Sequence, residues 1–286
     1  MGRLLRLFGK KNIIMAKNRF SWIAVVTIIC CLLYCCTSQQ ITIPPSSLHS
    51  LKKEISPDKV ISVLQKRAEK ITTVKSTLSM TIQSKELAQQ KKLKGFIAVR
   101  KPGVIRFKGF TFLGLKLFDL VIKDNDFQLF LPSKNELYQG NREDAYNSPI
   151  SLPLLPDDIT SIFYSDLYES PHLHCWEEEG YYLLSSVQGV DTTPLRSKKL
   201  WIEKGQLTIV AMEVYNRGEL DTRYSFDNYK LVGENYFPYS VEIERVTDGS
   251  FVKIAIDTIE LNHPIDPEAF RINADTIKSI NTLGKE

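Results

Sequence analysis

Short apolar runs separated by turn residues occupy most of the chain after residue 73. The runs are rich in Val, Ile, Phe and Tyr and recur at intervals of roughly 8 to 12 residues, the spacing of an antiparallel sheet. Turn signals such as Asn216-Arg217-Gly218 separate them. The pattern predicts an up-and-down meander with strands at 74–84, 93–100, 104–110, 115–122, 127–131, 181–186, 199–203, 207–215, 222–229, 239–246 and 251–261.

Two segments follow the helical period instead. Ser56 as N-cap and Pro57 at the first helical position predict a helix over 57–70. Its apolar face consists of Val60, Ile61, Leu64, Ala68 and Ile71. A second helix begins at Pro156, with Asp157 and Asp158 in its first turn and Ile159, Ile162 and Phe163 on one side. The amphipathic first helix is expected to cover a sheet.

The strand over 115–122 is apolar on both faces. Leu115, Leu117 and Val121 alternate there with Phe118, Leu120 and Ile122. Because one face of an antiparallel sheet usually meets water, two apolar faces indicate that both are covered. The sequence therefore predicts an α+β domain over 57–275 with a strongly curved antiparallel sheet and a helix or a ligand cavity on its concave side. Residues 276–286 are expected to form a C-terminal tail.

The first 35 residues have the pattern of a bacterial lipoprotein signal peptide. Six basic residues and no acidic residue precede an apolar stretch that is short of the roughly 20 residues of a spanning helix. Leu33-Tyr34-Cys35-Cys36 resembles a lipobox, which makes Cys36 the expected lipidated residue. Cys30, Cys31 and Cys35 offer alternative registers for the lipidated residue, and an uncleaved membrane anchor is the other interpretation of this segment. Met15 offers a second start site.

Residues 36–56 are expected to be the lipidated Cys and a flexible tether, since they include Pro44-Pro45 and show no sustained periodicity of apolar and polar residues. The chain has 37 basic and 33 acidic residues, and without the basic signal segment its net charge is about −2. This balance argues against a nucleic-acid partner. Only Cys175 remains outside the signal region, so no internal disulfide is possible.

Candidate catalytic chemistry is sparse. His172, His174 and Cys175 could ligate a metal, but no second Cys or His cluster supplies a fourth ligand. The paired carboxylates at 157–158 and 177–179 have no neighbouring nucleophile, and known nucleotide, protease and hydrolase motifs are missing from the sequence. We therefore expect no metal, no cofactor and no enzymatic activity. A metalloenzyme would require a metal site at His172 and His174.

Three parts of the sequence resemble the bacterial lipoprotein-localisation family of LolA and LolB. They are the helix over 57–70 that runs into a long strand, the strand, apolar loop and strand over 104–120, and the closing segment 261–270. The resemblance implies a half-open β-barrel with lid helices and an apolar interior that receives the acyl chains of lipoproteins. It also implies that Leu113 inserts into the membrane when cargo is delivered.

Two sets of candidate site residues follow. Phe110, Phe112 and Leu113 crowd a turn where polar residues are usual, which indicates a membrane or partner contact, or else the core at the end of a strand pair. The expected cavity-lining residues are Phe107, Phe118, Leu120 and Ile122.

Together these observations predict a monomeric lipoprotein of the outer membrane that faces the periplasm. Thr37 follows Cys36, whereas an Asp there favours inner-membrane retention in such lipoproteins. The expected partners are membrane lipids, acylated lipoproteins and a periplasmic carrier protein. The alternative is an envelope sensor or scaffold that binds a lipid or protein without transferring anything.

Overall fold

The computed structural model describes residues 55–84, 89–147, 150, 152–163, 173–188, 196–273 and 277–283. The chain divides into two compact units, residues 1–42 and 43–286, and all described residues belong to the second. The predicted signal peptide and the lipidated Cys36 therefore lie outside the described residues.

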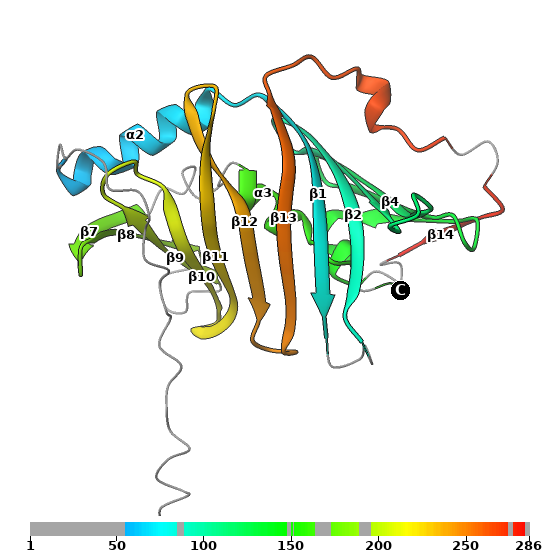
Figure 1. Ribbon diagram of the computed structural model, residues 1–286. Helices are drawn as coiled ribbons and strands as arrows, with labels where there is room; N and C mark the ends of the chain where they lie inside the picture. Colours follow the sequence, from blue (N-terminus) through cyan, green and yellow to red (C-terminus); the bar gives the residue numbers. More distant parts are fainter. Residues whose placement is uncertain are drawn as a thin grey trace, which may run out of the picture. The chain divides into compact units, whose positions relative to one another are not determined.

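A single sheet of fourteen strands dominates this unit (Figure 1). Its strands are β1 (Thr73–Gln83), β2 (Lys91–Arg100), β3 (Val104–Phe110), β4 (Lys116–Lys123), β5 (Asp126–Leu131), β6 (Glu136–Asn141), β7 (Leu173–Glu178), β8 (Tyr181–Gln188), β9 (Arg196–Glu203), β10 (Ile209–Asn216), β11 (Glu219–Val232), β12 (Asn235–Arg245), β13 (Ser250–Leu261) and β14 (Ser279–Thr282). The predicted strands are all present, with ends that differ by a few residues. Three strands, β6, β7 and β14, were missing from the prediction.

The strand order is β14-β6-β5-β4-β3-β2-β1-β13-β12-β11-β10-β9-β8-β7. Neighbouring strands are antiparallel except for β14, which pairs with β6 in parallel. Figure 1 shows β12, β13, β1 and β2 side by side in the centre of the sheet. β7 and β8 lie at one side of these four strands and β4 and β14 at the other, and these outer strands run at an angle to the central ones. The predicted C-terminal tail thus contributes an edge strand to the sheet.

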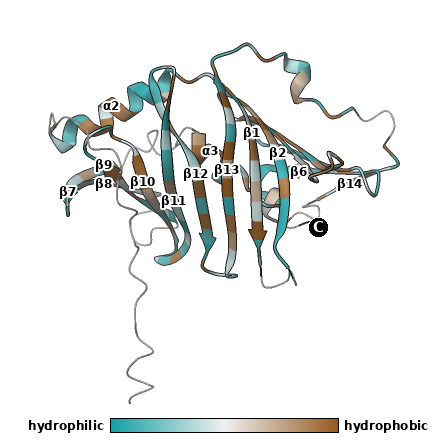
Figure 2. Cartoon of the chain, viewed as in Figure 1, coloured by the Kyte–Doolittle hydropathy of each residue, from teal (hydrophilic) through white to brown (hydrophobic). Residues whose placement is uncertain are grey.

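The two α-helices of the described residues pack on one face of the sheet. α2 (Pro57–Glu69) has Ser56 as N-cap and Pro57 in its first turn, as predicted, and it buries Val60 and Leu64. α3 (Pro156–Phe163) buries its apolar side chains in the same core cluster. Along β13, side chains on this face are buried and those between them are mostly exposed or half-buried, and Figure 2 shows the corresponding bands of apolar and polar residues.

The opposite face is covered over β2 to β4, and Ala211 and Glu213 on this face of β10 are buried as well. The 3-10 helix η3 (Pro267–Phe270) places Phe270 against Ala98 and Val104 in a second, small apolar cluster. Arg106 on this face donates to the Ala269 carbonyl at 2.5 Å and to both carboxylate oxygens of Asp119. Two covered faces are therefore found only in the later part of β4, where Asp119 and Val121 are buried on this face and Phe118, Leu120 and Ile122 on the other. Leu115 and Leu117, predicted on the same face as Val121, are exposed.

Candidate functional site

The N-terminal turn of α3 carries a buried carboxylate. Asp158 is 2% exposed and accepts hydrogen bonds from the backbone amide of Leu155 at 2.7 Å and from the Tyr224 hydroxyl at 2.6 Å. Arg245 lies 2.5 Å from the same carboxylate. The bond to Leu155 caps the helix, while β11 and β12 supply the other two partners. Asp158 therefore fixes the position of α3 on the sheet.

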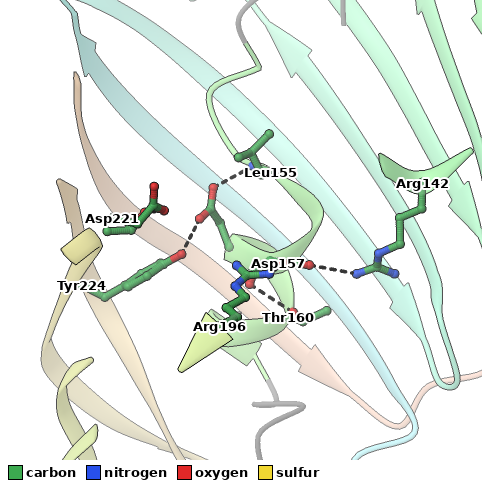
Figure 3. Close-up of polar contacts among 9 residues, drawn as sticks. Arg142, Leu155, Asp157, Thr160, Arg196, Asp221 and Tyr224 are labelled. Carbon is green, nitrogen blue, oxygen red and sulfur yellow. Dashed lines mark hydrogen bonds and ion pairs between the residues drawn. The ribbon is translucent and has the colours of Figure 1, made fainter. Parts of the chain in front are cut away.

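The neighbouring carboxylate of Asp157 binds two further arginines. Arg142, in the 3-10 helix η1 (Arg142–Asn147), lies 3.3 Å from its carboxylate, and Arg196 of β9 lies 2.5 Å away. Figure 3 shows the two arginines on different sides of the start of α3. Two adjacent carboxylates thus bind three arginines from separate parts of the chain, where the sequence predicted only a helix start.

Tyr224 titrates abnormally in this environment. Burial, the charge of Asp158 and the hydrogen bond to it together hold the pKa of the Tyr224 hydroxyl well above its usual value. The hydroxyl is therefore protonated at neutral pH and donates its hydrogen bond to Asp158.

A small cavity lies beside α3. It has a volume of about 100 Å³, whereas small-molecule sites usually measure about 300 to 1,000 Å³. The cavity is lined by side chains from α2, α3 and β10 to β12, among them Leu64, Arg67, Phe163, Phe226 and Tyr229. Arg67 donates to the Gln206 carbonyl at 2.8 Å, so the wall is polar on one side.

The four predicted cavity residues lie elsewhere. Phe107, Phe118, Leu120 and Ile122 are buried in the main core, and Phe107 and Phe118 pack edge to face with ring centroids 4.9 Å apart. None of them lines the described cavity, because the concave side beside β3 and β4 is filled by packed side chains. Their contact with a ligand stays a prediction.

The loop between β3 and β4 presents an exposed apolar surface, called here the tip. Its residues are Phe112, Leu113 and Leu115 of the loop and Leu117 at the start of β4, with exposed fractions of 57%, 89%, 66% and 41%. Phe110, the third predicted residue, is half-buried at the end of β3. The tip thus projects large apolar side chains into solvent, as expected for one of the two interpretations of this turn.

Hydrogen bonds hold the tip in one shape. The Thr111 amide donates to the Leu115 carbonyl at 2.9 Å, and the Gly114 amide donates to the Thr111 carbonyl at 3.0 Å. The Thr111 hydroxyl also accepts from the Leu115 amide. Gly114 has φ of 83°, a left-handed conformation that glycine adopts without strain. The apolar residues are therefore presented by an ordered turn.

The possible metal ligands do not converge among the described residues. His174 and Cys175 lie on β7, and His172 lies outside the described residues. No group of three His, Cys, Asp or Glu side chains in the described part could hold a metal ion. Burial and the charge of Asp58 raise the pKa of the Cys175 thiol to about 11.

Neither described helix is long and apolar enough to cross a membrane.

Comparison with solved structures identifies the fold. A domain from Vibrio parahaemolyticus named for outer membrane lipoprotein sorting aligns with a TM-score of 0.58 at 12% identity, covering 75% of this chain and 97% of that one. A LolA superfamily protein from Nitrosomonas europaea gives 0.56 at 13% identity, covering 76% and 98%. A DUF1329 family protein from Desulfovibrio piger gives 0.58 at 14%, covering 76% and 98%.

The curved antiparallel sheet with helices on one face is thus the LolA-like fold, in agreement with the resemblance seen in the sequence. No protein-family model matches the chain. No curated protein matches it either.

Proposed function

We propose that this protein is an outer-membrane lipoprotein that binds acyl chains on the helix-covered face of its sheet and helps to insert them into the membrane. In this proposal the sheet acts as a half-open barrel, and α2 and α3 are its lid. The observation that carries the proposal is the tip, where an ordered turn exposes Leu113 and its apolar neighbours. Large exposed apolar surfaces mark membrane or partner contacts.

Binding requires that acyl chains replace side chains of the protein. α3 is short, and its Ile159, Ile162 and Phe163 fill the space over the sheet. Each methylene that moves into an apolar site contributes about 0.8 kcal/mol, so a chain of ten or more methylenes offsets the loss of these contacts. The described cavity beside Phe163 is where an acyl chain would begin to enter.

The N-terminal sequence, which lies outside the described residues, supports the proposed location. Lipidation of Cys36 would anchor the protein, and Thr37 at the next position favours the outer membrane, facing the periplasm. We expect a monomer that receives acylated lipoproteins from a periplasmic carrier protein and needs no cofactor, metal or catalytic group.

Mass spectrometry under native conditions tests the binding step. The fragment 43–286 is a compact unit that contains every described strand and helix, and we expect it to co-purify with phospholipid or to take up an acylated peptide. Absence of both from fragment purified without detergent would contradict lipid binding. For the anchor, we expect Cys36→Ser to abolish metabolic labelling with a fatty-acid analogue, and persistent label would place the anchor at Cys31 or Cys35.

One observation favours the second candidate, a sensor or scaffold that transfers nothing. The side chains of Phe107, Phe118, Leu120 and Ile122 fill the interior that was expected to be open. If the fragment binds no lipid yet still captures a protein partner through the tip, the scaffold explains the fold better than a carrier does.

A further inference from the structure

The tip is bordered by lysines. In the register of the sheet, Lys94 of β2 lies opposite Phe110, and Phe110 lies opposite Lys116 of β4. β2 begins three residues before Lys94, so Lys91 and Lys92 lie beyond the last pair of β2 with β3, alongside the tip. The side chains of all four lysines are exposed or reach the surface. Apolar residues at the turn are thus flanked by positive charge on both strands.

One cation–π contact ties the lysines to the tip. The ammonium of Lys94 lies 5.8 Å from the centre of the Phe112 ring. A lysine in this position can cover the ring with its methylenes. If the ring entered a bilayer, the charge of the lysine could remain at the level of the lipid headgroups. The arrangement matches the amphipathic boundary of a bilayer.

Negative charge is almost missing from this part of the sequence. From Lys91 to Lys123 the chain has nine basic residues and one acidic residue, Asp119. Asp119 is buried, and its carboxylate is bound by Arg106 at 2.7 Å and Lys116 at 3.2 Å. Its charge is therefore neutralised within the protein, and residues 91–123 carry a net positive charge, although the chain without its signal segment is nearly neutral.

We infer that the tip docks on anionic phospholipid, with Lys91, Lys92 and Lys94 bound to phosphate-bearing headgroups while Phe112 and Leu113 enter the acyl region. This inference rests on the proposed insertion of the tip and names the class of lipid that it selects. Basic residues close to an anionic surface each strengthen binding by about fivefold at moderate ionic strength. Apolar insertion alone would not distinguish anionic from zwitterionic lipid.

Co-sedimentation of the fragment 43–286 with vesicles tests the inference. We expect tighter binding to phosphatidylcholine vesicles that contain phosphatidylglycerol than to phosphatidylcholine alone, and the difference should shrink as salt is added. The double variant Lys92→Gln/Lys94→Gln should weaken binding to the anionic vesicles by about 25-fold and leave binding to neutral vesicles unchanged.

A matched control separates the position of the charges from their number. Lys59→Gln/Lys123→Gln removes two exposed lysines, one on α2 and one at the far end of β4 from the tip. This control should bind anionic vesicles like the parent protein. Equal loss in both double variants, or equal binding of the parent to the two kinds of vesicle, would overturn the inference.

The same assay keeps the two proposals distinguishable. Leu113→Glu should weaken binding to both kinds of vesicle, because it removes apolar insertion, whereas the lysine variants act on anionic vesicles alone. If the lysine variants behave as expected but no acyl chain is ever carried, the proposed transfer fails while the anionic docking surface remains. If Leu113→Glu and the lysine variants leave binding unchanged, the tip is not the docking surface.

Discussion

The hydroxyl of Tyr224 lies 2.6 Å from the carboxylate of Asp158, and both side chains are almost completely buried. This bond joins α3 to β11 and, through Arg245, to β12. A helix of eight residues is too short to be stable by itself, so tertiary contacts must hold it. The hydrogen bond and the ion pair of Asp158 are the polar part of these tertiary contacts.

Asp158→Asn is expected to destabilise the fold by about 3 kcal/mol, because it leaves the Arg245 charge buried without its counterion. The corresponding fall in melting temperature is about 10 °C for a domain of this size. If α3 is the lid, the variant should also bind an acyl probe more readily. Thermal unfolding and probe titration of the same preparation measure the two effects.

The neighbouring Asp157 provides a control for this prediction. Its side chain is 17% exposed and its two arginines are more exposed than Arg245. Solvent weakens such pairs, so Asp157→Asn should cost only about 1 kcal/mol. A loss as large as that of Asp158→Asn would mean that burial does not set the strength of these contacts.

Stability at alkaline pH should depend on Tyr224. Its pKa is raised in the folded state, so the stabilisation is fully present below the ordinary value of about 10 and is lost as the pH rises above it. Tyr224→Phe cannot ionise and should flatten the decline in unfolding free energy above pH 10. It should also be less stable at pH 7, by about 1 to 2 kcal/mol. Chemical denaturation at several pH values gives both results, and an unchanged alkaline slope would contradict the prediction.

Two glycines near the tip should respond differently to alanine. A Cβ on Gly109 would lie 2.2 Å from the Phe118 ring, which is already packed against Phe107. Gly109→Ala should therefore destabilise the fold by about 1 to 3 kcal/mol through overpacking. Gly114 has open space around it, and Gly114→Ala should cost about 1 kcal/mol from its left-handed backbone alone. Equal melting temperatures would show that Phe118 can move aside.

Leu113→Glu separates a membrane role of the tip from a structural one. Because Leu113 is 89% exposed, the substitution should change the melting temperature little. Entry into a bilayer would nevertheless be opposed, since an ionised carboxylate resists leaving water. The variant should accept an acylated peptide from solution but fail to pass it to liposomes. Normal transfer by a stable variant would remove delivery from the functions of this loop.

Much of the fold could be predicted from periodicity, because burial on one face of a sheet imposes alternation. The missed strands lack that signal. β6 (Glu136–Asn141) is half polar, and β14 (Ser279–Thr282) has only Ile280 as a large apolar side chain, which is itself exposed. β14 at the edge of the sheet and β6 beside it are held by backbone pairing more than by burial, and backbone pairing has no local sequence pattern.

The site was only half predictable for a related reason. Exposure of Leu113 could be anticipated because the apolar residues occur at a turn, which is a local feature. The role of Asp158 could not, because Tyr224 and Arg245 are 66 and 87 residues away in sequence. In the same way, the apolar residues of β4 did not reveal whether helix, strand or ligand would fill the space beside them.

The pairing of β1 with β13 has a consequence for folding kinetics. Thr77 and Thr258 are bonded across these strands although 181 residues separate them, and the pair lies in the middle of the sheet. Strands β2 to β6 and β8 to β12 can each form hairpins locally, but the two halves join only when residues near 260 are available. Contacts at such long separation slow folding. A chain delivered from its N-terminus would therefore keep the two halves of its sheet apart until nearly all of it has emerged.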